Sequence, residues 1–408
     1  MCAQSLTAKT ALLLLLVGQG VGNGVNAQSL IWIGTFGGAR SSATSVSADG
    51  RVVVGSADRA SGGSRAFRWT VASGLQDLGS FGGGNSLATD VSADGTLVVG
   101  FAQTPQGVNR AFRWTEQTGM EDLGVLWGDS SAAYAVSEDG LVIVGSTGNT
   151  SVGYRAFRWT SQTGMSLLAI PGGWVFAYDV SSDGSVIVGW RQGSDAGYVY
   201  RWVNHSVQDI GAVGRGGWVS QGARVSSDGN TVVGAGLDST SVVWAFRWTR
   251  ETGMVRLGGL GGTWSKANGV TARGEIVVGL SHDSTRTPRA VRWTPEAGVQ
   301  DLNILYAPLL TDGAILHTAN AISPDGRYIV GSGFNPASQH TQNAYLLDTW
   351  RAGDTNGDGC INDTDLLNVL FAFGSAGTGY TRHEDINKDD IVDDADLLMV
   401  LFNFGNGC

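Results

Sequence analysis

The hexapeptide Arg-Ala-Phe-Arg-Trp-Thr occupies residues 65–70 and recurs unchanged at 110–115 and 155–160. Weaker copies follow, so that six tryptophans succeed one another at intervals of 43 to 46 residues: Trp69, Trp114, Trp159, Trp202, Trp248 and Trp293. A second motif, Val-Ser-x-Asp-Gly, keeps this interval up to Asp325, with Arg273 in place of its aspartate in the sixth copy. The chain therefore contains seven copies of one unit, over residues 29–349.

Each copy has the pattern of four short strands. In the second copy these are 86–92, 96–100, 110–115 and 120–124, where apolar and polar residues alternate or β-branched residues cluster. Asp-Gly and Thr-Gly pairs stand between them and supply the positive φ angles that tight hairpin turns need. Four strands in about 45 residues is typical of a β-propeller blade.

The two ends of the repeat region predict how such a ring closes. The seventh copy provides only three strands, at 317–323, 327–331 and 343–348. The missing strand matches residues 29–34, which precede Thr-Phe-Gly-Gly just as residues 76–79 precede Ser-Phe-Gly-Gly. We expect a mainly β chain, a seven-bladed β-propeller closed by its N-terminal strand. An open β-solenoid or β-helix is the alternative.

The composition excludes several classes of protein. The chain has 408 residues, of which 42% are hydrophobic and 62 are glycine, so it can bury a large core and is not a disordered protein. Three cysteines are too few for a disulfide-dense scaffold. A net charge of −10 provides no overall basic field for nucleic acid. Residues 351–408 hold −8 of this charge, which marks a second region of different chemistry.

The first residues have the pattern of an export signal. Lys9 precedes the apolar run 11–17, and Val25-Asn26-Ala27 matches a small-x-small cleavage site. The run is shorter than the roughly 20 apolar residues that span a bilayer, and no later segment qualifies. We expect residues 1–27 to be a secretory signal peptide and the protein to be secreted, with a short cytosolic helix as the alternative. A disulfide could persist in that setting.

The repeated arginines and tryptophans favour a scaffold role, because a ring has many copies of its packing but a single central site. We expect the second arginine of each hexapeptide to pair with blade carboxylates such as Asp77, Asp122, Asp209 and Asp301. An arginine-lined substrate site is the alternative. The arginines concerned are Arg68, Arg113, Arg158, Arg201, Arg247 and Arg292.

Tryptophans outside the repeat pattern are candidates for binding. Trp127, Trp174, Trp218 and Trp264 fall in the segments that join one blade to the next. The last three belong to consecutive blades, so we expect them side by side at one rim, where flat aromatic faces suit sugar rings or an apolar partner. The alternative is that they fill gaps between blades. The five histidines show no metal-ligand spacing, and no nucleophile elbow is present.

The C-terminal region contains two acidic loops, 31 residues apart, with oxygen-bearing side chains at the positions of an EF-hand-type loop. We expect each loop to bind one calcium ion, with Cys360 and Ile391 contributing backbone carbonyls. Asp390 replaces the usual glycine at position 6 of the second loop, which we expect to weaken that site. The expected ligands are Asp354, Asn356, Asp358, Cys360, Asn362 and Asp365, then Asp385, Asn387, Asp389, Ile391, Asp393 and Asp396.

Each loop leads into an apolar segment, 365–374 and 396–405, with nearly the same sequence. As helices these segments are apolar almost all round, which is more than so small a region can bury. An outward apolar surface predicts a protein partner.

These motifs resemble two known families. The frame Asp-Leu-Gly-x-x-Gly-Gly, Val-Ser-x-Asp-Gly and Arg-Ala-Phe-Arg-Trp-Thr resembles the extracellular HAF repeat family over residues 29–348, which implies a secreted, propeller-like protein without an assigned reaction. Aspartate at loop position 12, a helix only after each loop and the tandem spacing resemble a type I dockerin over residues 354–405.

The dockerin resemblance implies calcium-dependent folding and docking onto a cohesin, often in polysaccharide-degrading assemblies. It also implies that the chain ends of this region meet, so that Cys360 and Cys408 form a disulfide; two free thiols are the alternative. By the same resemblance, loop positions 10 and 11 and the following leucines contact the partner. These residues are Asp363, Thr364, Leu366, Leu367, Asp394, Ala395, Leu397 and Leu398.

The sequence therefore predicts three parts: a signal peptide at 1–27, a propeller at 29–349 and a dockerin-like domain at 351–408. We expect a secreted, non-catalytic binding propeller that is attached through this domain to a cohesin-like or other extracellular partner, with glycan binding on the propeller face. The alternative is a carbohydrate-active propeller enzyme, a glycoside hydrolase or lyase, delivered by the same domain. That alternative requires an unrepeated carboxylate pair at the centre of the ring.

Overall fold

The computed structural model describes residues 28–168, 170, 172–193, 196–204, 206–212, 223–338, 340–375, 383–387 and 391–408. The predicted signal peptide at 1–27 lies outside them. The described residues form two compact units, a larger one that runs from Ser29 to Thr349 and a smaller one that begins at Trp350. No helix among these residues is both long and apolar enough to cross a membrane.

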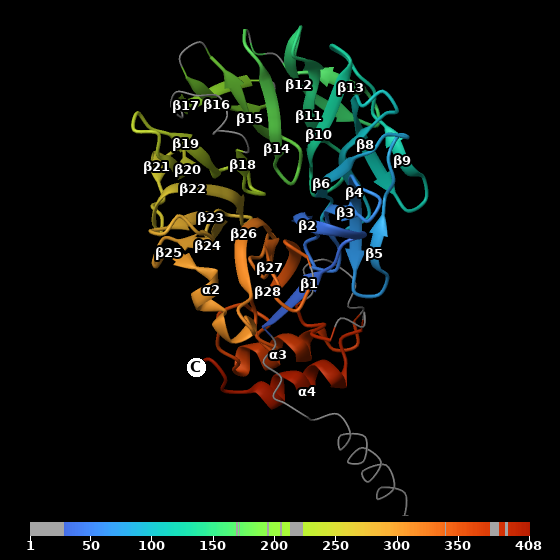
Figure 1. Cartoon of the computed structure of the whole chain (residues 1–408). Helices are drawn as coiled ribbons and strands as arrows, with labels where there is room; N and C mark the ends of the chain where they lie inside the picture. The colour runs from blue at the N-terminus through green and yellow to red at the C-terminus, as the bar shows by residue number, and fades with distance from the viewer. Residues whose placement is uncertain are drawn as a thin grey trace, which may run out of the picture. The chain divides into compact units, whose positions relative to one another are not determined.

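Short antiparallel strands build the larger unit, and consecutive strands form consecutive sheets (Figure 1). The first three sheets are β2–β5 (Gly37–Val46, Val53–Arg59, Ser64–Thr70, Gly74–Asp77), β6–β9 (Ser86–Val91, Val98–Gln103, Asn109–Thr115, Gly119–Asp122) and β10–β13 (Ser130–Val136, Ile143–Asn149, Gly153–Thr160, Gly164–Leu167). The fourth sheet is β14–β17 (Val175–Val180, Val186–Gln192, Gly197–Val203, Ser206–Ala212).

The next sheet has eight strands and divides into two halves of four. The halves are β18–β21 (Arg224–Val225, Val232–Leu237, Val243–Thr249, Gly253–Arg256) and β22–β25 (Gly261–Val270, Val277–Asp283, Pro288–Thr294, Gly298–Asp301). A single parallel pair, Val243 with Trp264, joins them. The short helices α2 (Leu302–Leu305) and η2 (Ala307–Leu309) then lead to the last sheet.

The last sheet contains both ends of the larger unit. Its strands are β26 (Ile315–Ile322), β27 (Tyr328–Phe334) and β28 (Asn343–Asp348), and β1 (Ser29–Ile33) pairs antiparallel with β28, as the incomplete seventh copy predicts. This sheet also contacts the first one, since the Ser41 amide donates to the Gln342 carbonyl at 3.0 Å. In Figure 1 the blue strand β2 accordingly lies beside the orange strands β26–β28.

The Val-Ser-x-Asp-Gly motif forms the turn between the first and second strands of a sheet. In the second copy the Ser92 hydroxyl donates to Asp94 Oδ1 at 2.6 Å and accepts from the Leu97 amide at 3.0 Å. Asp94 Oδ1 also accepts from the Thr96 amide, and Gly95 has a φ of +71°, which favours glycine. The repeated motif is therefore a self-contained hydrogen-bonded turn.

The hexapeptide forms the third strand and supplies the core. In β8, Ala111 and Phe112 are fully buried and Trp114 is 6% exposed. Gly100 lies on the neighbouring strand, where an added Cβ would come within 2.9 Å of the Phe112 ring and 2.0 Å of the Leu87 carbonyl oxygen. In the four copies that have this phenylalanine, the glycine at this place leaves room for its ring; these glycines are Gly55, Gly100, Gly145 and Gly234.

The predicted pairing of the second arginine with Asp77 and Asp122 is wrong, and the strand register explains why. Asp122 stands opposite Phe112, whereas Glu121 stands opposite Arg113. Opposite residues share one face of a sheet, so Asp122 lies 3.7 Å from the first arginine, Arg110, and Glu121 lies 2.8 Å from Arg113. Asp77 likewise pairs with the first arginine of its copy, at 3.9 Å.

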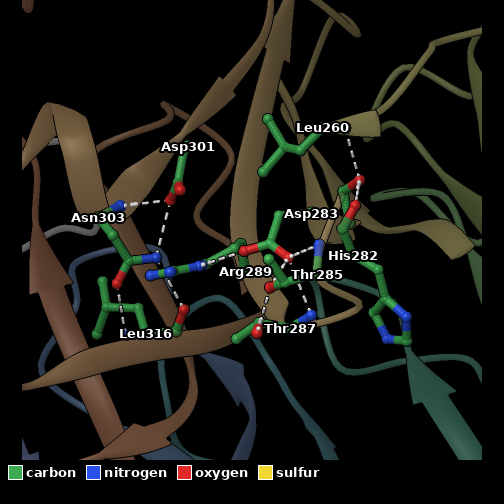
Figure 2. Close-up of polar contacts among 10 residues, drawn as sticks. Leu260, His282, Asp283, Thr285, Thr287, Arg289, Asp301, Asn303 and Leu316 are labelled. Atoms are coloured by element: carbon green, nitrogen blue, oxygen red, sulfur yellow. Dashed lines mark hydrogen bonds and ion pairs between the residues drawn. The ribbon is translucent and has the colours of Figure 1, made fainter. Parts of the chain in front are cut away.

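The other two predicted carboxylates also serve different partners. Asp209 stands opposite Tyr200 and accepts from the Gly211 amide at 2.9 Å. Asp301 caps α2 by accepting from the Asn303 amide at 2.8 Å, and the Asn303 side chain in turn binds Leu316 on β26 (Figure 2). These carboxylates thus stabilise turns and helix ends rather than the repeated arginines.

The smaller unit has two helices, α3 (Asp363–Ala372) and α4 (Asp394–Asn403), each directly after one acidic loop. Both begin with a capping box, Asn362 with Asp365 in α3 and Asp393 with Asp396 in α4. The buried core of this unit is small. It consists of Ala352, Ile361, Val369, Ile386, Val392 and Val400.

Candidate functional site

Six aromatic side chains gather where the sheets β10–β13 and β14–β17 meet. Tyr154 on β12 contacts Trp174 edge-on and stacks on Phe176, with ring centroids 5.4 and 5.3 Å apart. Phe176 stacks in turn on Tyr178, at 5.8 Å, and on Trp190, at 5.9 Å. Tyr134 completes the cluster by contacting Tyr178 at 5.3 Å. Such a cluster fixes the rings in defined orientations.

A pocket of about 460 Å³ opens against this cluster. Its aromatic walls are Phe101, Tyr134, Tyr154, Trp174, Phe176 and Trp190. The polar lining consists of serine, threonine, asparagine and glutamine, and none of the lining side chains carries a charge. The pocket therefore suits a neutral ligand with both apolar faces and hydroxyl groups.

Trp190 has an unusual place in this pocket. Its side chain is 2% exposed, and its indole Nε1 has no hydrogen-bond acceptor among the described residues. Buried indole N–H groups normally find a partner, because an unmade hydrogen bond costs about 1–3 kcal/mol. The Nε1 atom is itself enclosed by its neighbours, so Trp190 offers the pocket its ring and not its N–H group.

The tryptophans predicted to form one rim have different surroundings. Trp174 is a wall of the aromatic pocket, whereas Trp264 is 40% exposed, belongs to β22 and stacks on His282 at 6.1 Å. Trp218 lies outside the described residues. Trp127, 39% exposed, donates to the Val152 carbonyl and lies under the Arg155 guanidinium.

The residues next to His282 form a structural network rather than a catalytic one. Figure 2 shows Asp283 between Arg289 and two threonines, Thr285 and Thr287, at the turn that joins β23 to β24. The hydrogen bond from the Thr285 hydroxyl, followed by the backbone amides of Thr287 and Thr285, lowers the pKa of Asp283 to about 2. Asp283 is thus ionised and fully engaged in the turn.

A second, smaller cavity of about 130 Å³ is lined by residues from the innermost strand of every sheet. It contains three carboxylates and one guanidinium, that of Arg224. Asp90 and Asp179 stand at the same position of two copies, and Glu138 has no counterpart in the other copies. Burial raises the pKa of Asp179 to about 7, against the opposing effect of the Arg224 charge. Burial also raises the pKa of Asp90 and of Glu138.

Asp90 and Asp179 have equivalent contacts in their two sheets. Asp90 Oδ2 accepts from the Val136 amide at 2.9 Å, and Asp179 Oδ2 accepts from the Val225 amide at 2.8 Å, each in the next sheet. Glu138 accepts from the Ser227 hydroxyl, two sheets further on. Asp90 and Asp179 therefore join neighbouring innermost strands, whereas Glu138 joins turns of two sheets that are not consecutive. All three are groups in this cavity that could hold a proton.

The acidic loops of the smaller unit offer hard oxygen donors. Asp354 and Asp365 of the first loop are 4% and 0% exposed. Burial, and then the nearby charges of Asp365 and Asp358, raise the pKa of Asp354 despite hydrogen bonds from Gly357 and Gly359. Calcium prefers oxygen ligands that carry negative charge, and the clustered carboxylates of this loop are ligands of that kind.

The loop carboxylates are also bound by the loop's own backbone. Asp365 accepts from the Thr355 and Asn362 amides, and Asp396 accepts from the Ile386 and Asp393 amides. Within the described part of the chain, no three acidic, histidine or cysteine side chains are grouped closely enough to hold a metal. Two second-loop residues, Asp389 and Asp390, lie outside that part.

A disulfide joins Cys360 in the first loop to Cys408 at the end of the chain, with Cα atoms 4.7 Å apart. The Ile361 amide donates to the Asn406 carbonyl, and the Gly405 amide donates to the Ile361 carbonyl, next to this bond. The first loop and the last residues are therefore held together both covalently and by backbone hydrogen bonds.

The two helices expose matching apolar positions. Leu367 and Leu398 are 47% and 42% exposed, while Leu366 and Leu397 pack against the core of the unit. The predicted partner residues at loop positions 10 and 11 are exposed as well. The remaining large exposed side chains on or next to the helices are Leu370, Phe371, Phe373, Leu401, Phe402 and Phe404.

Comparison with known proteins identifies the fold. The structure of an oligogalacturonate lyase in complex with manganese is similar over 78% of this chain and 90% of that one, with 12% identity and a TM-score of 0.50. Four-stranded sheets succeed one another, and the first strand completes the last sheet. The larger unit is a β-propeller.

Two further structures match with TM-scores of 0.42. TolB from Acinetobacter baumannii covers 85% of this chain at 12% identity, with 69% of its own length matched. A putative TolB from Agrobacterium tumefaciens covers 64% at 16% identity, with 89% of its length matched. No family model matches the sequence, and no curated protein does. These likenesses concern the propeller fold alone.

The sequence pointed to Trp174 but missed most of the propeller pocket. A signal was present, since Phe176 and Trp190 stand at repeat positions where the second copy has Leu87 and Phe101 and the third has alanine and serine. Departures from the repeat at fixed positions, rather than tryptophans alone, mark this pocket.

Proposed function

We propose that this chain is a secreted, non-catalytic β-propeller of seven blades that binds a neutral glycan in its aromatic pocket and is attached to a partner through its C-terminal unit. The observation that carries the ligand proposal is the aromatic pocket itself, whose described lining combines aromatic rings with uncharged polar side chains. The export proposal rests on the sequence pattern at residues 1–27.

The strand groups support seven blades. Six groups follow from consecutive strands when the eight-stranded sheet is divided at its single parallel pair, and the seventh is β26–β28 with β1. Contact between the last and first groups includes the Asn320 side chain, which donates to the Ala43 carbonyl at 2.8 Å. This contact is what a closed ring requires.

The pocket favours a sugar over a purely apolar ligand. Sugar rings present C–H groups to aromatic faces, which Trp174 and Tyr154 offer, and hydroxyl groups to polar side chains such as that of Gln192. Among the described residues the lining carries no charge, so none of them would neutralise an acidic sugar. A neutral oligosaccharide thus matches both features.

Calorimetric titration of the full chain with short neutral oligosaccharides of glucose, xylose or mannose tests this proposal. Replacing Trp174→Ala removes an aromatic wall, and Gln192→Ala removes an exposed polar group of the lining; we expect each to weaken binding about tenfold or more. Trp264→Ala, outside the pocket, is the matched control and keeps wild-type affinity. Unchanged binding in both pocket variants would contradict the proposal.

For the C-terminal unit we propose two calcium ions, held by the two acidic loops, and docking onto a cohesin-like extracellular protein. The donor chemistry supports the first part, because the ligands predicted from the sequence are oxygen atoms, and Asp354, Asp365, Asp385 and Asp396 among them are buried. The exposed leucines at equivalent places on α3 and α4 support the second. A role in polysaccharide degradation would follow from such an assembly.

Calcium addition after EDTA treatment of the full chain tests the metal. We expect calcium, but not magnesium at equal concentration, to raise the melting temperature of the C-terminal transition, with about two ions bound per chain by calorimetry. Asp354→Asn should remove one of the two, while Asp312→Asn in the propeller, outside either loop, should remove neither. An EDTA-treated chain that melts as before would reject the calcium proposal.

Binding of a recombinant cohesin, measured by surface plasmon resonance, tests the docking surface. We expect Leu367→Glu and Leu398→Glu to abolish capture, because each places a charge on an apolar face. Leu141→Glu, an exposed leucine of the propeller, is the control. If the cohesin does not bind the wild-type chain, the docking proposal fails while the glycan proposal stands.

A carbohydrate-active enzyme is the second candidate function. It is favoured by one observation, the carboxylates Asp90, Glu138 and Asp179 in one cavity with raised pKa values, since such groups can act as general acids near neutral pH. Release of reducing ends or unsaturated products from polysaccharides, lost in Asp179→Asn, would favour it over the non-catalytic proposal.

A further inference from the structure

The propeller contains a strongly basic pocket of about 680 Å³ that is separate from the aromatic one. It is formed by β16, β20 and the turns next to them, and it includes four arginines: Arg201, Arg247, Arg250 and Arg273. Glu251 is its one acidic lining residue among those described. Such a concentration of positive charge stands out in a chain with a net charge of −10.

Two of the arginines lie deep in the pocket and bind only backbone oxygens in the contacts that the structure gives. Arg201 is 8% exposed, and its Nε and Nη2 donate to the Gly229 carbonyl at 3.2 and 2.7 Å. Arg247 Nε donates to the Gly274 carbonyl at 3.3 Å. Burial, followed by the charge of Arg250, lowers the pKa of Arg201. These guanidinium groups are therefore positioned by the backbone without neutralisation of their charge.

Two of the equivalent arginines elsewhere have polar side chains opposite them that accept a hydrogen bond. Arg113 pairs with Glu121 at 2.8 Å, and Arg292 donates to Gln300 Oε1 at 2.9 Å. The register places Val255 opposite Arg247, so the neighbouring strand offers Arg247 no side-chain acceptor at that place. Arg247 donates to the backbone carbonyl of Gly274 instead.

The other two arginines are departures from the repeat. Arg273 stands in the sixth copy at the place where the other six copies have aspartate, and Arg250 follows the third strand where the second copy has Glu116. Both are exposed. Asp228 acts electrostatically on Arg201 and Arg273, while its oxygens accept from Ser226 and Asn230 in its own turn. Two carboxylates, Glu251 and Asp228, against four guanidinium groups leave the pocket with an excess of positive charge.

We infer that this pocket binds a multivalent oxyanion, a small molecule or chain end that carries carboxylate, sulfate or phosphate groups. Guanidinium groups bind such anions through paired, charge-assisted hydrogen bonds, and four of them around one cavity exceed what a single monovalent ion needs. The volume admits a ligand larger than one phosphate. The inference does not depend on the proposed glycan site, which has no charged lining residue.

Calorimetric titration of the full chain with pyrophosphate, sulfate and citrate at constant ionic strength tests the inference. The decisive variant is the double replacement Arg250→Glu and Arg273→Asp, because both new residues are those that the same chain uses at equivalent places in other blades. It should fold normally, as its melting temperature will show. We expect it to weaken binding of the preferred anion by about 100-fold or more.

Arg40→Ser, which removes an exposed arginine from the first blade, is the matched control and should leave the affinity unchanged. Tighter binding of citrate than of pyrophosphate and sulfate would assign a carboxylate ligand, and the reverse order would assign a sulfate or phosphate ligand. If the double variant melts at a lower temperature than the wild type, the single replacement Arg250→Gln is tested instead. Failure of all three anions to bind the wild type, or equal losses in the variant and the control, would overturn the inference.

Discussion

In the propeller a fully buried phenylalanine recurs at the same place in four blades, as Phe67, Phe112, Phe157 and Phe246, and its surroundings extend from one sheet into the next. The C-terminal unit instead has six buried core residues, two capping boxes and one disulfide. Neighbouring blades pack against one another, so removing one contact should lower the stability of the propeller by only a small fraction. The C-terminal unit has few stabilising contacts, so each one contributes a larger fraction of its stability, as in small domains generally.

The largest effect on stability should follow from removing the disulfide of the smaller unit. Replacing Cys360→Ser together with Cys408→Ser opens a loop of 48 residues, which the chain-entropy treatment converts to about 4 kcal/mol of stability. We expect the C-terminal transition in differential scanning calorimetry to shift strongly downward. The propeller transition should stay in place, and a shift of both transitions together would show that the two units do not melt independently.

A smaller effect on stability, which depends on pH, should come from Asp179 in the central cavity of the propeller. The pKa of Asp179 is raised to about 7, so the unfolded chain loses this proton at lower pH than the folded one. The stability contributed by the protonated group is therefore present below about pH 4 and is lost as the pH rises to about 7, on the order of 2–4 kcal/mol. Asp179→Asn should flatten this dependence in guanidinium unfolding between pH 5 and 8.

Asp183 in the same blade is the matched control. Hydrogen bonds, first of all from the Ser185 amide, lower its pKa, so its contribution is lost only at acidic pH. Asp183→Asn should therefore reduce stability without changing its slope between about pH 5 and 8. Equal slopes in the wild type and Asp179→Asn would show that Asp179 is ionised in the folded protein.

The smallest effect should come from one repeated turn. Ser92→Ala removes the hydroxyl that binds both Asp94 and the Leu97 amide, and it leaves a buried amide without its partner, at a cost of about 1–2 kcal/mol. Chemical unfolding of the propeller measures this loss, and Ser73→Ala, in an exposed turn, should change stability by less than about 0.5 kcal/mol. If Ser92→Ala lowered the free energy of unfolding as much as removing the disulfide does, the idea that packing between blades limits the effect of one lost contact would be wrong.

Features that depend on contacts between residues close in the chain could be predicted from the sequence, whereas most features that depend on distant contacts could not. Turns such as Ser92 with Asp94, the four-strand pattern and the capping residues before α3 and α4 are local, and the sequence predicted the elements that contain them. The pairing of β1 with β28 was also predictable, because one strand was missing at one end and surplus at the other. The arginine partners were not, since a shift of one residue in register moves a carboxylate to the other face of the sheet.

By itself the sequence determined that a unit recurs, that each copy forms short strands and tight turns, and that an acidic region with two apolar segments follows. These conclusions rest on periodicity and turn chemistry, which act between residues close in the chain. Only the tertiary structure decided that Tyr154, Phe176 and Trp190 share one pocket and that Arg201 and Arg273 share another. Each pocket combines residues from different blades. These residues lie close together only because neighbouring sheets pack against one another, and no single stretch of sequence determines that packing.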